Sequence, residues 1–293
     1  MISRKQMSIW WFIPAAALLS VIVAYPLMRT FLLSFVRKSL STGFRAEFVG
    51  VDNFIRIIFD SRFWDCFRTT ALFTIVSVTV EFLIGLVLAI SVGSLKTFRS
   101  LSRVVFLIPW TLPTAVIAVL WAWIFNDQFG VLNAILLRVG VIDSPVIWLG
   151  QPGPAMVAII VADVWKTTPF VFLILFAGLQ NIPRDLYEAI EVDGGGAWDQ
   201  FRFVTWPNLL PFAFVAVIFR VVQAFAIFDL VWVMTGGGPG GATETVSIYT
   251  YQTYMRYLDF GYGAALAIAT VVILALTAAT LHRLLLAKYE QSF

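Results

Sequence analysis

The chain has 293 residues, of which 60% are hydrophobic and 13% are charged, and its net charge is +3. A soluble domain carries about 25% charged residues, so this composition excludes an ordinary soluble protein and predicts an integral membrane protein. The basic residues form no run, which argues against a nucleic-acid partner. One cysteine, Cys66, and one histidine, His282, are too few for a disulfide or for a metal site built from these residue types.

Continuous apolar runs predict an all-α membrane protein, because about 20 apolar residues cross the hydrocarbon core of a bilayer as a helix. The first run follows Arg4 and Lys5 as in a signal peptide, but it is too long for the apolar part of a cleaved signal. We therefore expect six transmembrane helices, at approximately residues 9–28, 69–94, 104–125, 155–179, 211–234 and 263–286.

Six spans place both termini on the same side of the membrane. The basic residues divide evenly between the two sides, so the short loop from Lys96 to Arg103 carries the most weight. It contains basic residues and no acidic ones, which favours the cytoplasmic side. Both termini are then expected to be cytoplasmic, with an external loop at residues 29–68 and a cytoplasmic loop at residues 180–210.

The loop at residues 180–210 is polar and rich in glycine, although apolar spans flank it. Pro183 suits the first turn of a helix, and the glycines at 194–196 end it, because glycine adopts left-handed dihedral angles without penalty. A second helix can begin at Ala197 before Pro207 interrupts it. The loop is longer than a plain connection, so we expect a helix–corner–helix docking element.

The stretch "YEAIEVDGGG", residues 187–196, resembles the EAA loop of ABC importer permeases. It differs from that family at Ile190 and Gly195, where alanines are usual. The resemblance implies that the loop seats in a groove of a cytoplasmic ATPase subunit and transmits its movement. The coupling residues that it implies are Glu188, Ala189, Asp193, Gly194 and Gly195.

Other stretches, among them "GVDNFIRII", "VWKTTPF" and "FDLVWVMTGGGPGGATET", look like the carbohydrate-permease branch that includes the maltose and glycerol-phosphate importers. The resemblance implies a type I ABC importer permease in the bacterial cytoplasmic membrane that moves a sugar, oligosaccharide or sugar-like osmolyte by alternating access. It implies a second, related permease subunit, commonly in a heterodimer, two ATPase subunits, and an extracytoplasmic solute-binding protein.

The chain lacks the signature of a nucleotide site. None of its lysines follows a glycine, so it contains no phosphate-cradling GxxxxGK[ST] motif. We therefore expect no enzymatic activity and no cofactor in this chain, with ATP and Mg²⁺ bound by the partner ATPase.

Several ionisable residues lie inside the predicted spans. Each costs about 2.5–3.5 kcal/mol at a lipid-exposed helix centre, so they are expected to face the protein interior or a cavity. Helical spacing allows Asp163 to pair with Lys166, and it places Arg220 and Gln223 on one face.

The charges near the middle of the membrane balance, which suits an uncharged hydroxylated solute better than an anion. The expected substrate pathway comprises Glu81, Asp163, Trp165, Lys166, Arg220, Gln223, Phe228 and Asp229. The alternative is an internal salt-bridge network that only holds the helices together.

Three other functions stay open. A glycerol-phosphate permease shares these motifs, so an anionic solute is one alternative. An ion-coupled secondary transporter would show inverted repeats, and the sequence has no convincing repeat. A membrane-embedded enzyme would have to use a carboxylate site at Glu81 and Asp163.

Overall fold

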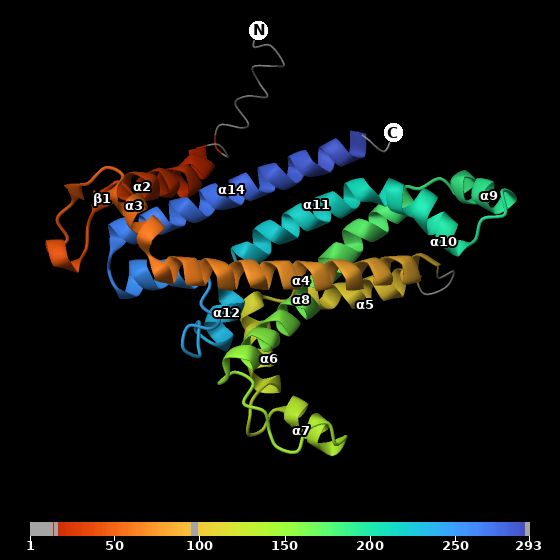
Figure 1. Ribbon diagram of the computed structural model, residues 1–293, viewed down its shortest axis with the longest axis horizontal. Coiled ribbons are helices and arrows are strands. Elements are labelled where there is room, and N and C mark those ends of the chain that lie inside the picture. The colour runs from red at the N-terminus through yellow and green to blue at the C-terminus, as the bar shows by residue number, and fades with distance from the viewer. Residues whose placement is uncertain (1–13, 15–16, 95–98, 291–293) are drawn as a thin grey trace, which may run out of the picture. The chain divides into compact units, whose positions relative to one another are not determined.

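The computed structural model describes residues 14, 17–94 and 99–290, which are mostly helical (Figure 1). They divide into two compact units. One comprises the residues up to Trp64 together with Tyr249–Ile273, and the other comprises Asp65–Ile248 together with the residues from Leu274 onward.

The first unit combines the N-terminal segment with the region around the start of the last long helix. It contains a two-stranded antiparallel sheet in which Val36 pairs with Phe48. Its elements are η1 (Ser20–Ala24), α2 (Tyr25–Leu33), β1 (Val36–Arg37), η2 (Leu40–Thr42), β2 (Glu47–Phe48), α3 (Asp52–Phe59), η4 (Gln252–Arg256) and the beginning of α14 (Phe260–Glu290).

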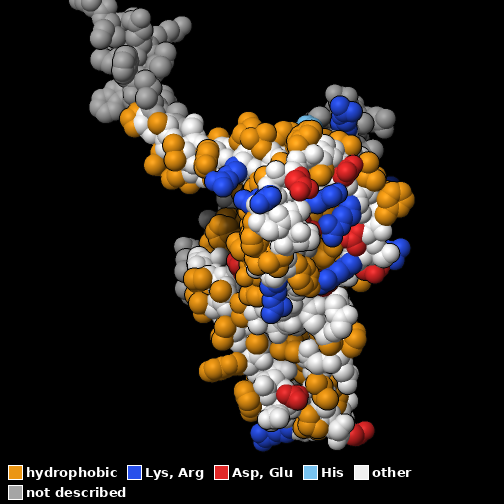
Figure 2. All heavy atoms as spheres, turned by 90° about the vertical axis from the view of Figure 1, so that its left-hand side faces the viewer, with side chains coloured by type: hydrophobic (Ala, Val, Ile, Leu, Met, Phe, Trp, Pro, Cys, Tyr) orange, Lys and Arg blue, Asp and Glu red, His pale blue; other side chains and the backbone are white. Residues whose placement is uncertain are grey.

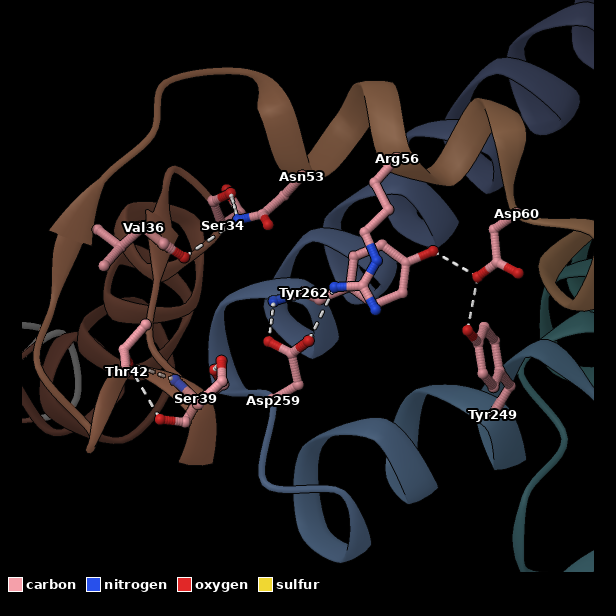
Figure 3. A network of polar contacts seen from close by, with 11 residues as sticks. Ser34, Val36, Ser39, Thr42, Asn53, Arg56, Asp60, Tyr249, Asp259 and Tyr262 are labelled. Carbon is pink, nitrogen blue, oxygen red and sulfur yellow. Dashed lines mark hydrogen bonds and ion pairs between the residues drawn. The ribbon is translucent and has the colours of Figure 1, made fainter.

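A polar network holds the first unit together (Figure 3). One carboxylate oxygen of Asp60 accepts hydrogen bonds from the hydroxyls of Tyr249 and Tyr262, each at 2.5 Å. Arg56 pairs with Asp259 at 2.9 Å and lies over the ring of Tyr262. Partial burial alone would raise the pKa of Asp60, but the hydrogen bonds outweigh it and the pKa is lowered.

Several basic side chains lie on the surface of the first unit. Arg37, Arg45 and Arg62 are exposed, and Arg62 donates a hydrogen bond of 2.9 Å to Gln252. Figure 2 shows Lys and Arg side chains together with Asp, Glu and hydrophobic ones on the face that it presents. The unit therefore offers a charged surface around a core of tyrosine–carboxylate contacts.

The second unit is a packed helical bundle. Its elements are most of α4 (Ser61–Ser94), then α5 (Arg99–Thr111), α6 (Thr114–Ile124), α7 (Val131–Arg138), α8 (Pro152–Gln180), α9 (Arg184–Val192), α10 (Ala197–Asp199), η3 (Gln200–Thr205), α11 (Trp206–Phe225), α12 (Asp229–Met234), the first half of α13 (Val246–Tyr251) and the part of α14 from Leu274 onward.

Glycines let the long helices of this bundle approach closely. A Cβ atom added at Gly85 of α4 would lie 2.9 Å from Val171 on α8, and one added at Gly178 of α8 would lie 2.7 Å from the ring of Phe212 on α11. Apolar side chains of α4, α8 and α11 fill the space around these crossings. The three helices are thereby held at a separation that allows polar side chains to meet between them.

Four described helices are long and apolar enough to cross a membrane: Ser61–Gly93, Pro152–Gln180, Ala197–Phe225 and Phe260–Arg283. A fifth span results if the helices Val105–Thr111 and Thr114–Ile124, bent by 103°, are counted together. The bend follows Thr111, because the ring of Pro113 disfavours helical dihedral angles in the residue before it.

Two predicted spans differ from the helices of the structure. The first, at residues 9–28, lies partly outside the described residues, and Ala17–Leu33 forms an apolar helix. The predicted span 211–234 corresponds to two helices, because α11 ends at Phe225 and α12 begins at Asp229. The count of six spans stays a prediction.

Candidate functional site

Three helices of the second unit meet at a buried ionic cluster. Arg220 of α11 binds both oxygens of Glu81 on α4, with distances of 2.5 Å from Nε and 2.8 Å from Nη2. The same Nη2 lies 3.0 Å from Oδ2 of Asp163 on α8. Thr167 of α8 donates a further hydrogen bond of 2.7 Å to Glu81.

The cluster is removed from solvent. The side chains of Arg220, Glu81 and Asp163 are 3%, 0% and 8% exposed. A guanidinium offers donors in a planar fork, so one arginine can satisfy two carboxylates at once. The arrangement joins α4, α8 and α11 through side chains that are buried in the second unit.

The structure confirms one expected polar neighbour and adds a closer partner to another. Nη1 of Arg220 donates a hydrogen bond of 3.0 Å to Gln223, one turn further along α11. Asp163 interacts electrostatically with Lys166, as expected, but its closest charged partner among the described residues is Arg220, at 3.0 Å. Lys166 is turned about 60° around α8 from Asp163, and the bidentate arginine faces the carboxylate from the next helix.

The other expected pathway residues are accessible on the same unit. Trp165, Gln223 and Asp229 are exposed, while Lys166 and Phe228 are half-buried. The charge of Lys166 interacts most strongly with Asp163 of the buried cluster and more weakly with Asp229.

The two aromatic residues of this accessible group, Trp165 and Phe228, each contact a further aromatic ring. Trp165 meets Trp121 edge-on at 5.8 Å, and Phe228 stacks on Trp232 at 5.8 Å. The eight expected residues therefore separate into a buried brace and an accessible group of aromatic, amide and charged side chains. That second mixture offers hydrogen bonds and flat apolar surfaces together.

The polar loop between α8 and α11 has the expected helix–corner–helix shape. α9 ends at Val192, and Gly194 follows with a φ of +78°, a conformation that favours glycine. The amide of Gly196 donates a hydrogen bond of 2.9 Å to the carboxylate of Asp199, which closes the corner at the start of α10. The chain then continues through η3 into α11.

Gly195 is required for a different reason. A Cβ atom at this position would lie 2.4 Å from Cγ2 of Ile190 and 3.1 Å from its carbonyl oxygen. Ile190 and Gly195 are the two positions at which this sequence departs from the EAA pattern. The departures compensate each other, because the larger side chain at 190 occupies the space that a methyl group at 195 would need.

The expected coupling residues lie on the surface of this loop. Glu188 and Ala189 are exposed on α9, and Asp193 is exposed at its C-terminal end. Sequence reasoning missed two apolar residues beside the corner: Val192 is 87% exposed and Trp198 is 68% exposed. Large apolar side chains in an otherwise polar, glycine-rich loop were the signal that could have identified them.

Comparison with known families gives a match over most of the chain. Residues 81–290 match the family described as "Binding-protein-dependent transport system inner membrane component". This range includes both the buried cluster and the polar loop.

Individual relatives are similar over nearly their whole length. The trehalose/maltose transport system permease protein MalF of Thermococcus litoralis is 40% identical, over 89% of this chain and 87% of that protein. The sulfoquinovosyl glycerol transport system permease protein SmoG of Agrobacterium fabrum is 41% identical, over 87% and 82%. The trehalose transport system permease protein SugA of Mycobacterium tuberculosis is 35% identical, over 91% and 84%.

Among solved structures, a chain of a bacterial ABC transporter involved in the import of the acidic polysaccharide alginate has a similar fold. The TM-score is 0.83, with 97% of this chain and 96% of that chain covered and 19% sequence identity.

Proposed function

Because the chain belongs to the family of binding-protein-dependent transport system inner membrane components, we propose that it is the permease subunit of an ATP-driven importer. Its solute is a sugar, an oligosaccharide or a sugar-like osmolyte. The observation that carries the choice of solute is the set of permeases at 35–41% identity whose names refer to trehalose, maltose or sulfoquinovosyl glycerol.

The accessible polar group supports a carbohydrate pathway. Gln223, Lys166 and Asp229 offer donors and acceptors, and Trp165 and Phe228 offer apolar faces on the same unit. Sugars present both kinds of surface, hydroxyl groups at the rim and C–H groups on the ring faces. The charges of Lys166 and Arg220 balance those of Glu81 and Asp163, which suits a neutral solute. In this proposal the solute contacts the accessible group, and the buried cluster of Arg220 supports the helices behind it.

The surface of the polar loop supports the proposal that a separate ATPase subunit binds to it. Its tip presents Val192 and Trp198 beside Glu188 and Asp193, so it combines an apolar contact surface with acidic groups. Apolar side chains this exposed are typical of protein contacts. We place the loop on the cytoplasmic side, with both termini, where an ATPase subunit that binds ATP and Mg²⁺ would grip it.

The proposed assembly contains further subunits. It has two permeases, of which the second is a related chain in a heterodimer, two ATPase subunits and an extracytoplasmic binding protein that delivers the solute. One structure similar to this chain is that of an alginate ABC transporter in complex with a periplasmic protein bound to alginate pentasaccharide. Alternating access then exposes the accessible group to each side of the membrane in turn.

Reconstitution tests this proposal. The chain is purified with the proteins encoded beside its gene and placed in proteoliposomes with ATP inside and loaded binding protein outside. We expect uptake of a labelled disaccharide that needs both ATP and the binding protein, with glycerol phosphates as competitors to test the anionic alternative. Uptake driven by a proton or sodium gradient without ATP would instead identify a secondary transporter.

A further inference from the structure

Two side-chain contacts cross the polar loop from one arm to the other, and we call them the rungs. The hydroxyls of Tyr187 and Thr205 lie 3.0 Å apart, and Nε2 of Gln200 donates a hydrogen bond of 3.0 Å to Glu191. Tyr187 and Glu191 belong to α9, while Gln200 and Thr205 belong to η3. Each rung therefore joins the arm before the glycine corner to the arm after it.

The backbone of η3 is what brings the rungs into line. Tyr187 and Glu191 are four residues apart, so in an α-helix they lie on one face, about 6 Å apart along the axis. Gln200 and Thr205 are five residues apart, which an α-helix would turn to different faces. η3 is a π-helix over Gln200–Thr205, and its i→i+5 pattern brings residues five apart to the same side.

The arm after the corner is a direct extension of a long helix. η3 ends at Thr205 and α11 begins at Trp206, and the helical stretch Ala197–Phe225 runs on without interruption. The same α11 carries Arg220 into the buried cluster. The arm before the corner is less firmly attached, because Asn181–Pro183 separates α9 from α8 and Gly194 follows it.

We infer that the rungs are a positioning device that makes the loop a rigid lever. They hold α9 and η3 at a fixed separation. A movement of the ATPase subunit against the tip of the loop then displaces α11 and Arg220, instead of bending the chain at the two ends of α9. Glu191 and Gln200 form the outer rung nearest the tip, and Tyr187 and Thr205 form the inner one. The inference rests on the proposed docking of this loop on an ATPase subunit.

The outer rung allows a test by exchange of its partners. Gln200→Ala removes the hydrogen bond, whereas the double variant Glu191→Gln with Gln200→Glu rebuilds it with donor and acceptor exchanged. The measurement is the number of solute molecules transported per ATP hydrolysed by the reconstituted complex. We expect Gln200→Ala to lower this ratio about fivefold, the size expected for the loss of one solvent-exposed hydrogen bond, while ATP hydrolysis continues. The exchanged pair restores the ratio.

Tyr187→Phe is the second variant, because it keeps the ring and removes only the hydroxyl group that meets Thr205. It too should lower the ratio, and it decides the matter if Gln200→Ala fails to assemble. A wild-type coupling ratio in both single variants, or an exchanged pair that assembles and stays uncoupled, would overturn the inference. A wild-type complex that contains no ATPase would contradict the proposed function instead, so the two failures are distinguishable.

Discussion

The buried cluster and the polar loop of this chain use opposite strategies to hold polar groups in place. Arg220 meets residues that are 139 and 57 positions away, and all three side chains are shielded from water. The rungs of the loop join residues only 9 and 18 positions apart at its partly exposed surface. The cluster exists only when three helices are packed, whereas both rungs join residues within the loop itself.

The difference between buried long-range contacts and exposed local contacts suits the two regions to different tasks. Charges buried among helices are expensive to separate, so the cluster is suited to holding the bundle in one of a few discrete arrangements. Contacts at the surface are individually weak and can be rebuilt after a movement. A loop that must receive force from another protein benefits from local contacts, because its shape then survives when the bundle changes.

The largest effect that we expect comes from Arg220→Ala. It leaves Glu81 and Asp163 buried without a partner, and loss of one member of a buried pair costs about 3–5 kcal/mol. Thermal unfolding of the purified complex in detergent measures the change, with Val215→Ala, an exposed residue of the same helix, as a control. Equal unfolding temperatures for Arg220→Ala and the wild type would show that the cluster contributes nothing to stability.

The next effect concerns the tip of the loop. Trp198→Ala removes a large exposed side chain, so we expect about tenfold weaker binding of the ATPase subunit with no loss of helical structure. Affinity is measured with the purified ATPase, and Val141→Ala, an exposed apolar residue on a different loop, is the control. Unchanged affinity for Trp198→Ala would remove this residue from the contact surface.

A further prediction concerns the corner itself. Gly195→Ala forces a methyl group against Ile190 and should destabilise the loop by about 1–3 kcal/mol, as overpacking generally does. Hydrogen exchange of the α9 amides measures the effect. Adding Ile190→Ala removes the obstructing side chain and should return exchange toward the wild-type rate. If the double variant exchanges as fast as Gly195→Ala alone, the two residues do not compensate each other.

The smallest effect lies at Asp60, which accepts hydrogen bonds both from the neighbouring amides of Arg62 and Phe63 and from two tyrosines 189 and 202 positions away. Its pKa is lowered in the folded state, so its stabilising contribution is complete above the ordinary value of 3.8 and disappears as the pH falls through the lowered value. We expect the difference in stability between the wild type and Asp60→Asn to be constant from pH 7 to about pH 5 and to shrink only in stronger acid. A difference that shrinks near pH 6 would contradict the lowered pKa.

Sequence reasoning performed unequally in the two regions. For the loop it located the glycine corner and both helical arms, because proline and glycine act on the backbone locally. It also identified the family, which the comparisons confirm. For the cluster it named the right ionisable residues but did not place Arg220 beside Glu81 and Asp163, since spacing along one helix says nothing about which side chain a neighbouring helix supplies.

The amino-acid sequence by itself determined that this is a helical membrane protein, where its apolar runs lie, and that a polar elbow interrupts them. These properties follow from composition and from local backbone preferences. Only the tertiary structure decided that Arg220 holds Glu81 and Asp163 together, that Ile190 needs a glycine at 195, and that the rungs align across the loop. Those contacts depend on the rotation and separation of packed elements, which no single segment of the chain encodes.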